Sequence, residues 1–143
     1  MGKFNAKAQR GKAAKKKMTE NEISQVIVDC AIEVHKTLGG PGLLESVYEE
    51  ALAYELQKNS LQFKRQIEVP IRYKDRLLAS PLKLDLLVED KVIVEVKATT
   101  SYNSVFEAQT LTYLRLTDTK LGLVINFGER WVKNGIHRVV NNL

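Results

Sequence analysis

Residues 82–98 read LKLDLLVEDKVIVEVKA, and this stretch decides the fold. Apolar residues alternate with other residues in 82–88, and β-branched residues dominate 92–98. A period of two and a high β-branched content are typical of strands, and the three residues between the segments are charged. The stretch therefore predicts an antiparallel hairpin at the centre of a β-sheet.

The length of the connection decides whether Asp85 and Glu95 share a face of this hairpin. With three connecting residues, position 85 lies opposite position 95, whereas a two-residue connection places the two acids on opposite faces. Glu95 and Lys97 share a face in either register, and Val94 and Val96 then point into the core. Both registers are open to this sequence, and the chemistry of a paired acid group favours the first.

Two helices are predicted before the hairpin. Thr19 and Glu22 form a capping-box pattern, and apolar residues spaced by three and four predict a helix over about residues 20–37. Glycines and a proline at 39–42 end it, and a second helix is predicted over about residues 43–59.

The remaining segments complete a mixed sheet. Strands are predicted at 61–69, 71–78 (with a turn at Lys74-Asp75), 121–127 and 136–140, and a third helix at about 103–116. The order α-α-β-β-β-β-α-β-β predicts an α+β domain with helices packed on a mixed β-sheet.

Composition excludes several classes of protein. The chain has 143 residues, which suits one domain, and 44% are hydrophobic, which is enough for one core. The single Cys30 excludes an intrachain disulfide. No apolar run approaches the roughly 20 residues of a membrane span. We therefore expect a cytoplasmic protein without a membrane partner.

The net charge of +5 is concentrated near the N-terminus. Seven of the 22 basic residues fall within residues 1–17, which contain no acid, so residues 18–143 carry fifteen basic residues against 17 acidic ones. We expect residues 1–18 to form a basic disordered tail and residues 19–143 to form the folded domain. The tail could hold phosphates loosely, although a solubilising extension is the favoured interpretation.

Three candidate groups of residues could carry chemistry, and the first lies on the hairpin. Asp85 and Glu95 would repel each other if they were adjacent, and a divalent cation such as Mg²⁺ would neutralise them. Lys97 would add a positive charge for a reacting phosphate or an attacking water. The structural alternative is a Glu/Lys pattern on a solvated sheet face.

The other two groups lie on helices. Glu45 in the first turn of the second helix precedes Tyr48 by three residues, and Gln109 and Tyr113 are spaced to aim at the same place. A capping acid with a half-buried tyrosine, and an ordinary amphipathic helix, are the structural alternatives. We expect His35 to be a packed or dipole-satisfying histidine, with a site role as the lesser interpretation.

Together these motifs resemble the PD-(D/E)xK nuclease superfamily over about residues 19–141. Asp85 with Glu95-Val-Lys97 is similar to the superfamily signature, although no Pro-Asp pair stands at Asp85. The Gly42-x-x-Glu45-x-x-Tyr48 spacing resembles the motif of its GxxExxY proteins. Gln109-x-x-x-Tyr113 resembles the additional motif of the RecB-like branch.

The resemblance implies a restriction-endonuclease-like αβββαβ core and a phosphodiesterase site that uses Mg²⁺ or Mn²⁺. The metal ligands that it implies are Asp85, Glu95, the Val96 carbonyl and Glu45, and more weakly His35. Lys97 would activate the attacking water. The residues that would shape the site or bind the substrate are Gln109, Tyr113 and Tyr48. The expected function is metal-dependent hydrolysis of DNA. The alternative is a catalytically weak or inactive nuclease-fold module that binds nucleic acid or serves as an accessory.

Overall fold

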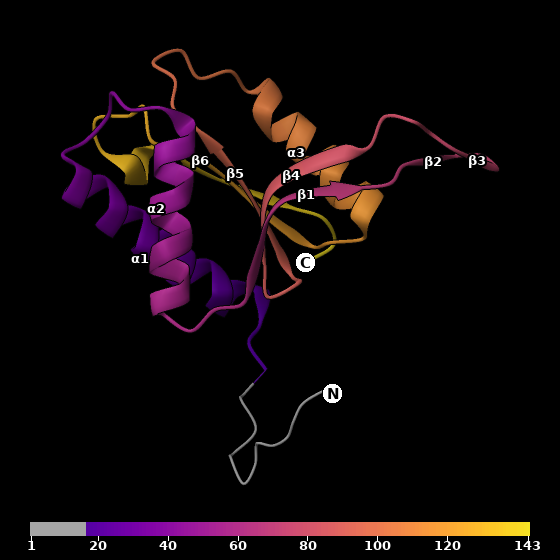
Figure 1. The fold of residues 1–143 in the computed structure, drawn as a ribbon, viewed down its shortest axis with the longest axis horizontal. Coiled ribbons are helices and arrows are strands. Elements are labelled where there is room, and N and C mark those ends of the chain that lie inside the picture. The colour runs from indigo at the N-terminus through magenta and orange to yellow at the C-terminus, as the bar shows by residue number, and fades with distance from the viewer. Residues whose placement is uncertain (1–16) are drawn as a thin grey trace, which may run out of the picture.

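The computed structural model describes residues 17–143 (Figure 1). In chain order the elements are α1 (Glu20–Leu38), α2 (Glu45–Lys58), β1 (Phe63–Val69), β2 (Arg72–Tyr73), β3 (Arg76–Leu77), β4 (Leu82–Val88), β5 (Val92–Lys97), α3 (Val105–Thr117), β6 (Leu121–Asn126), the 3₁₀ helix η1 (Val132–Gly135) and β7 (Ile136–Val140). Among these described elements, no helix combines the length and apolar character needed to cross a lipid bilayer.

The main sheet has five strands in the order β1-β4-β5-β6-β7. Strands β5 and β6 run parallel, and the other neighbours run antiparallel. Helices α1 and α2 cover one face of this sheet, and α3 covers the other (Figure 1). The predicted α+β class, with helices on a mixed sheet and a restriction-endonuclease-like core, is confirmed.

Two hydrophobic clusters hold the layers together. Under α1 and α2, buried residues of the helices meet those of the sheet: Ile23, Ile27, Cys30, Ala31, Val34, Tyr48, Leu52, Leu56, Leu61, Leu86, Val88, Val92, Val94, Val96, Leu121, Leu123, Ile125, Phe127 and Val132. Under α3, a smaller cluster is built from Leu82, Leu84, Ile93, Leu114, Val124 and Val139. Strand β6 is buried along its whole length, as its apolar sequence predicts.

The central hairpin has the register that brings the two acids together. Val88 pairs with Val92 and Leu86 with Val94, so three residues connect the strands and position 85 lies opposite position 95. Glu89 and Asp90 both adopt left-handed φ values, 54° and 56°, to make this turn. The first of the two registers is therefore confirmed.

The segment predicted as a strand over 71–78 forms a separate ribbon. Strands β2 and β3 have two residues each and, among the described strands, pair only with one another, on either side of the Lys74-Asp75 turn. The ribbon projects away from the domain (Figure 1). Its residues are polar or exposed on both faces, so it has no apolar side to bury against the main sheet.

The predicted basic tail lies almost entirely outside the described residues. Of residues 1–18, the structure describes Lys17 and Met18. Met18 is partly buried against the larger cluster, and its carbonyl accepts a hydrogen bond from Lys91 Nζ. Met18 is thus packed on the domain that is predicted over residues 19–143.

Candidate active site

The site forms where β4 separates from β5. Backbone pairing of the two strands ends at Leu86 and Val94. One residue further along, side chains replace the ladder: Asp85 N–H donates to Glu95 Oε2 at 3.2 Å, and Val96 N–H donates to Asp85 Oδ2 at 2.8 Å. The two strands thus remain joined because each carboxylate accepts a hydrogen bond from the backbone of the opposite strand.

The electrostatics of this pair are unfavourable for two negative charges. Glu95 is only 6% exposed. Burial, followed by the nearby Asp85 carboxylate, raises the pKa of Glu95 to about 8, although a backbone hydrogen bond from Asp85 and the charge of Lys97 act in the opposite direction. A proton or a cation is therefore needed to neutralise the pair near neutral pH.

Lys97 and two residues of α3, Gln109 and Tyr113, lie near the acids. Lys97 ends β5, and its Nζ lies 4.6 Å from the centre of the Phe106 ring. Burial raises the pKa of Tyr113, as do the charges of Glu95 and Asp85, whereas a hydrogen bond with the Gln109 side chain acts to lower it. The amide and the phenol are therefore paired with each other, and the phenol is close enough to the two acids for their charges to act on its pKa.

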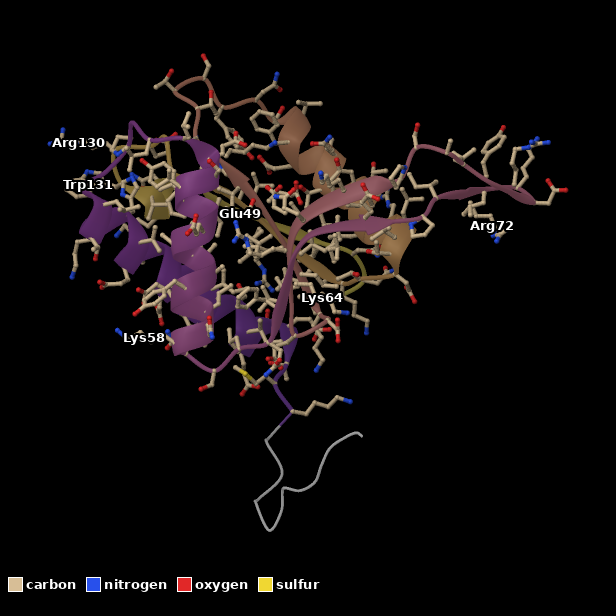
Figure 2. The ribbon with its side chains drawn as sticks, in the orientation of Figure 1. Glu49, Lys58, Lys64, Arg72, Arg130 and Trp131 are labelled. Atoms are coloured by element: carbon tan, nitrogen blue, oxygen red, sulfur yellow. The ribbon has the colours of Figure 1, made fainter. Side chains whose placement is uncertain are left out.

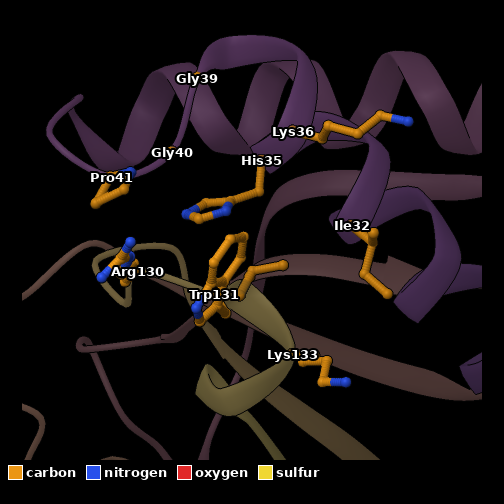
Figure 3. A pocket seen from close by; sticks show the side chains of 10 residues that line it. Ile32, His35, Lys36, Gly39, Gly40, Pro41, Arg130, Trp131 and Lys133 are labelled. Atoms are coloured by element: carbon orange, nitrogen blue, oxygen red, sulfur yellow. The ribbon is translucent and has the colours of Figure 1, made fainter.

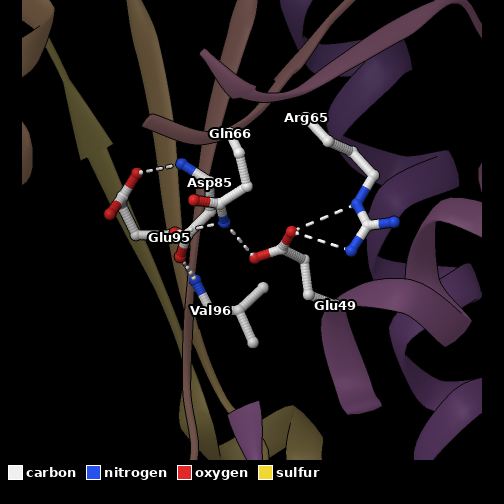
Figure 4. A network of polar contacts seen from close by, with 6 residues as sticks. All are labelled: Glu49, Arg65, Gln66, Asp85, Glu95 and Val96. Atoms are coloured by element: carbon white, nitrogen blue, oxygen red, sulfur yellow. Dashed lines mark hydrogen bonds and ion pairs between the residues drawn. The ribbon is translucent and has the colours of Figure 1, made fainter. Parts of the chain in front are cut away.

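A third carboxylate, Glu49 on α2, is joined to this group through Gln66. Glu49 Oε2 accepts from Arg65 Nε at 3.1 Å and forms an ion pair with Arg65 Nη2 at 3.1 Å. Gln66 Nε2 donates to Glu49 Oε1 at 2.8 Å and to Asp85 Oδ1 at 3.3 Å (Figure 4). Sequence reasoning missed Glu49, and its position four residues after Glu45 on one helix face is the signal that could have found it.

An irregularity in two strands brings Gln66 and Asp85 to this point. Gln66 lies within β1 at φ 49°, which breaks the alternation of the strand. As a result Phe63 packs against the larger cluster while Ile67 packs against the smaller one. In β4, on either side of Asp85, Leu84 likewise belongs to the smaller cluster and Leu86 to the larger one. The polar residues therefore lie at the seam between the cores.

Glu45 and Tyr48 have different environments. Glu45 is exposed, and its side chain forms no hydrogen bond or ion pair with the part of the chain that the structure describes. Tyr48 is fully buried, and its hydroxyl donates to Gly40 O at 2.7 Å and accepts from Leu43 N–H at 3.2 Å. Its ring stacks on Phe127, with the ring centres 4.7 Å apart. Tyr48 thereby fixes the loop that leads into α2.

This arrangement predicts the result of Tyr48→Phe. The substitution keeps the stacked ring but removes the hydroxyl, leaving Gly40 O and Leu43 N–H without this partner. We expect a loss of about 1–3 kcal/mol of stability, measured by urea unfolding. A control, Tyr54→Phe, changes a 62% exposed tyrosine on the same helix and is expected to leave stability nearly unchanged. Equal effects of the two changes would contradict the role given to Tyr48.

Asn126 joins the end of β6 to the loop after β5. This side chain is fully buried. Its Oδ1 accepts from Thr99 N–H and from Gly128 N–H, each at 3.0 Å, and its Nδ2 donates to Thr99 O at 3.0 Å. Next to it, Phe127 N–H donates to Lys97 O at 2.8 Å. These bonds fix the backbone that carries Lys97.

The acid pair fits a divalent cation that keeps open coordination positions. Within residues 17–143 no three His, Cys, Asp or Glu side chains form a group that could hold a metal ion. Mg²⁺, however, is commonly bound through one or two carboxylates together with waters and substrate phosphates. Asp85, Glu95 and the Val96 carbonyl offer hard oxygen ligands of this kind. His35, the weaker candidate for a metal ligand, has another partner: its Nε2 bonds to Phe127 O at 3.1 Å, and its ring contacts those of Tyr48 and Phe127.

A mixed sheet with helices on both faces, and an Asp/Glu/Lys group where two strands part, defines a nuclease-like domain. The chain belongs to the PD-(D/E)XK nuclease superfamily, whose family model matches residues 21–139. No curated protein matches the chain. The crystal structure of SSO0001 is similar, with a TM-score of 0.50 and 15% sequence identity over 87% of this chain. The match spans 60% of that protein, and it supports the fold alone.

Proposed function

We propose that this protein is a metal-dependent nuclease that hydrolyses phosphodiester bonds of DNA. The observation that carries the proposal is the exchange of side-chain and backbone hydrogen bonds between Asp85, Glu95 and Val96 beside Lys97, in a chain of the PD-(D/E)XK superfamily. A buried glutamate held beside a second carboxylate is an uncommon feature for a structural sheet and is typical of a reactive centre.

Each residue has a defined role in this proposal. Asp85, Glu95 and the Val96 carbonyl would hold Mg²⁺ or Mn²⁺, which when bound supplies positive charge to a phosphate and lowers the pKa of a water. Lys97 positions the attacking water and stabilises the negative charge that develops on the phosphate. Glu49 orients Asp85 through Gln66, because both acids accept hydrogen bonds from the same amide group.

The helix residues complete the proposed site. Tyr113 and Gln109 line it from α3 and hold the substrate backbone, and Tyr48 shapes it by fixing the loop before α2. Glu45 would join the metal only through a change of conformation or through a water. The likeness of these motifs to GxxExxY proteins and RecB-like nucleases supports placing the chain in that branch of the superfamily.

A cleavage assay with Asp85→Asn tests this function. Labelled single- and double-stranded DNA are incubated with the protein and Mg²⁺ or Mn²⁺, with RNA as a parallel substrate. We expect metal-dependent cleavage of DNA, and we expect Asp85→Asn to lower its rate by about 100- to 1,000-fold. Asp90→Asn is the control, since it removes the same charge from the turn of the same hairpin, where the Asp90 side chain is 75% exposed.

The outcomes separate the nuclease from the accessory module. Cleavage of RNA alone would replace DNA as the substrate. If the wild-type protein cuts no nucleic acid and binds no Mn²⁺ by calorimetry, the enzyme is excluded and a nucleic-acid-binding module remains. Equal loss of activity in the two aspartate variants would contradict the site.

A further inference from the structure

A cavity of about 510 Å³ lies between the end of α1 and the segment that begins η1. This size falls within the range of roughly 300–1,000 Å³ that is typical of small-ligand pockets. Its walls come from two parts of the chain: the end of α1 and the loop after it, with His35 and Lys36, and the segment of Arg130, Trp131, Val132 and Lys133 (Figure 3).

The charged side chains that line this cavity are all basic. Lys36, Arg130 and Lys133 line it, and among the described residues none of the lining side chains is acidic. Lys36 Nζ also lies 4.0 Å from Oε1 of Glu33, a residue that does not line the cavity. Because residues 18–143 contain more acids than bases, three cations around one apolar cavity form a local basic patch on a body that is otherwise slightly acidic.

Trp131 provides an aromatic surface in this patch. It is 62% exposed, which is unusual for so large an apolar side chain. The Arg130 guanidinium lies 5.5 Å from the centre of its ring. An exposed aromatic ring among basic side chains is the arrangement by which proteins stack bases of single-stranded nucleic acid and hold its phosphates.

We propose that this cavity binds an unpaired nucleobase, stacked on Trp131, and that Arg130 and Lys133 contact the adjoining phosphates of single-stranded DNA. The inference rests on the proposed function, because the nucleotides bound in the cavity would belong to the same DNA strand as the bond that is cleaved. A purely apolar ligand would not need the three basic side chains. A mononucleotide has a single phosphate group and would contact fewer of these side chains than a strand with several phosphates.

The chain path connects this cavity to the acid pair. Phe127 N–H donates to Lys97 O, and Phe127 O bonds to His35 Nε2, which lines the cavity. Phe127 thus stands between the end of β5 and the cavity wall. Both places lie at the carboxyl ends of the parallel strands β5 and β6, the edge where open sheets with parallel strands commonly bind ligands.

The binding experiment uses Trp131 as its own reporter, since it is the only tryptophan in the chain. Oligothymidine is titrated into the full-length protein in EDTA, so that no metal-dependent cleavage interferes. We expect the strand to quench tryptophan fluorescence, and a duplex or thymidine monophosphate at the same concentration to quench it much less. Quenching by the duplex or by the monophosphate equal to that by the single strand would overturn the proposal.

Variants test the same contact without the reporter. In fluorescence anisotropy with labelled oligothymidine, Trp131→Ala is expected to bind roughly 5- to 100-fold more weakly, and Trp131→Phe less so. Arg130→Gln is expected to lower the slope of log affinity against log salt by about 0.7. Lys58→Gln is the charge-matched control, because Lys58 lies at the far end of α2 (Figure 2).

The two proposals can fail separately. If DNA is cut but Trp131→Ala binds and cuts it as the wild-type protein does, the cavity is not a contact for the strand and the nuclease stands. If no nucleic acid is cut but single strands quench Trp131 and Trp131→Ala binds weakly, the cavity proposal stands and the nuclease falls. Binding that Lys58→Gln weakens as much as Arg130→Gln would also overturn the cavity proposal.

Discussion

Glu95→Gln is expected to reduce metal-dependent cleavage by about 100- to 1,000-fold while the metal-free protein becomes more stable. Glutamine keeps the size of the side chain and an oxygen that can accept the hydrogen bond from Asp85 N–H. It removes an acid that is buried beside a second acid. Loss of activity with a gain of stability is expected where a site holds like charges together for its function.

The pH dependence of this stability gain has a defined sign. In the folded protein the pKa of Glu95 is about 8, against 4.5 for the unperturbed group. Between these values the folded state retains a proton that the unfolded state has released, so wild-type stability falls as pH rises through this window. The stability advantage of Glu95→Gln in EDTA is thus expected to grow from pH 5 to pH 8, as followed by urea unfolding. An advantage that shrinks over this range would contradict the assignment.

Neighbouring positions on the same strand provide the contrast. Val94 and Val96 are buried in the larger cluster, so Val94→Ala and Val96→Ala are each expected to lose roughly 1–3 kcal/mol of stability. Their activity per folded molecule is expected to change far less than that of Glu95→Gln. If all variants lose activity in proportion to stability, Glu95 has only a structural role.

Several elements could be predicted because local patterns determine them. The capping box of Thr19 and Glu22 forms as predicted at the start of α1. The buried run of β6 and the hairpin strands also lie where their apolar periods place them. The register of the hairpin could not be decided from periodicity alone, because it depends on Glu89 and Asp90 adopting left-handed conformations without a glycine.

The network around the acid pair was less accessible to sequence reasoning. Gln66 reaches Asp85 because a left-handed residue interrupts β1, and no residue type in that strand signals the irregularity. The buried carboxylate of Glu49 has its partner in Arg65, sixteen residues away. Such partners are set by the packing of α2 on the sheet, whereas motif spacing describes only one element at a time.

The role of Asn126 could not be predicted from the sequence either. Asn126 stands at the end of an apolar strand, and its hydrogen-bond partners, Thr99 and Gly128, are known only from the structure. Asn126→Ala would leave two partly buried N–H groups and one carbonyl without these three hydrogen bonds at once. We expect a loss of at least about 3 kcal/mol of stability by urea unfolding. Because the same backbone carries Lys97, cleavage by the remaining folded protein is also expected to fall.

Asn141→Ala is the matched control for this last prediction. Asn141 lies beyond β7, and within residues 17–143 its Nδ2 donates a single hydrogen bond, to Thr119 O at 3.1 Å. Since that side chain is partly exposed, water can replace the bond, and we expect a loss of less than about 1.5 kcal/mol with unchanged cleavage. Urea unfolding and cleavage rates at low temperature, where both variants are folded, separate the two effects. If Asn126→Ala keeps full activity there, the Asn126 contacts stabilise the sheet without positioning Lys97.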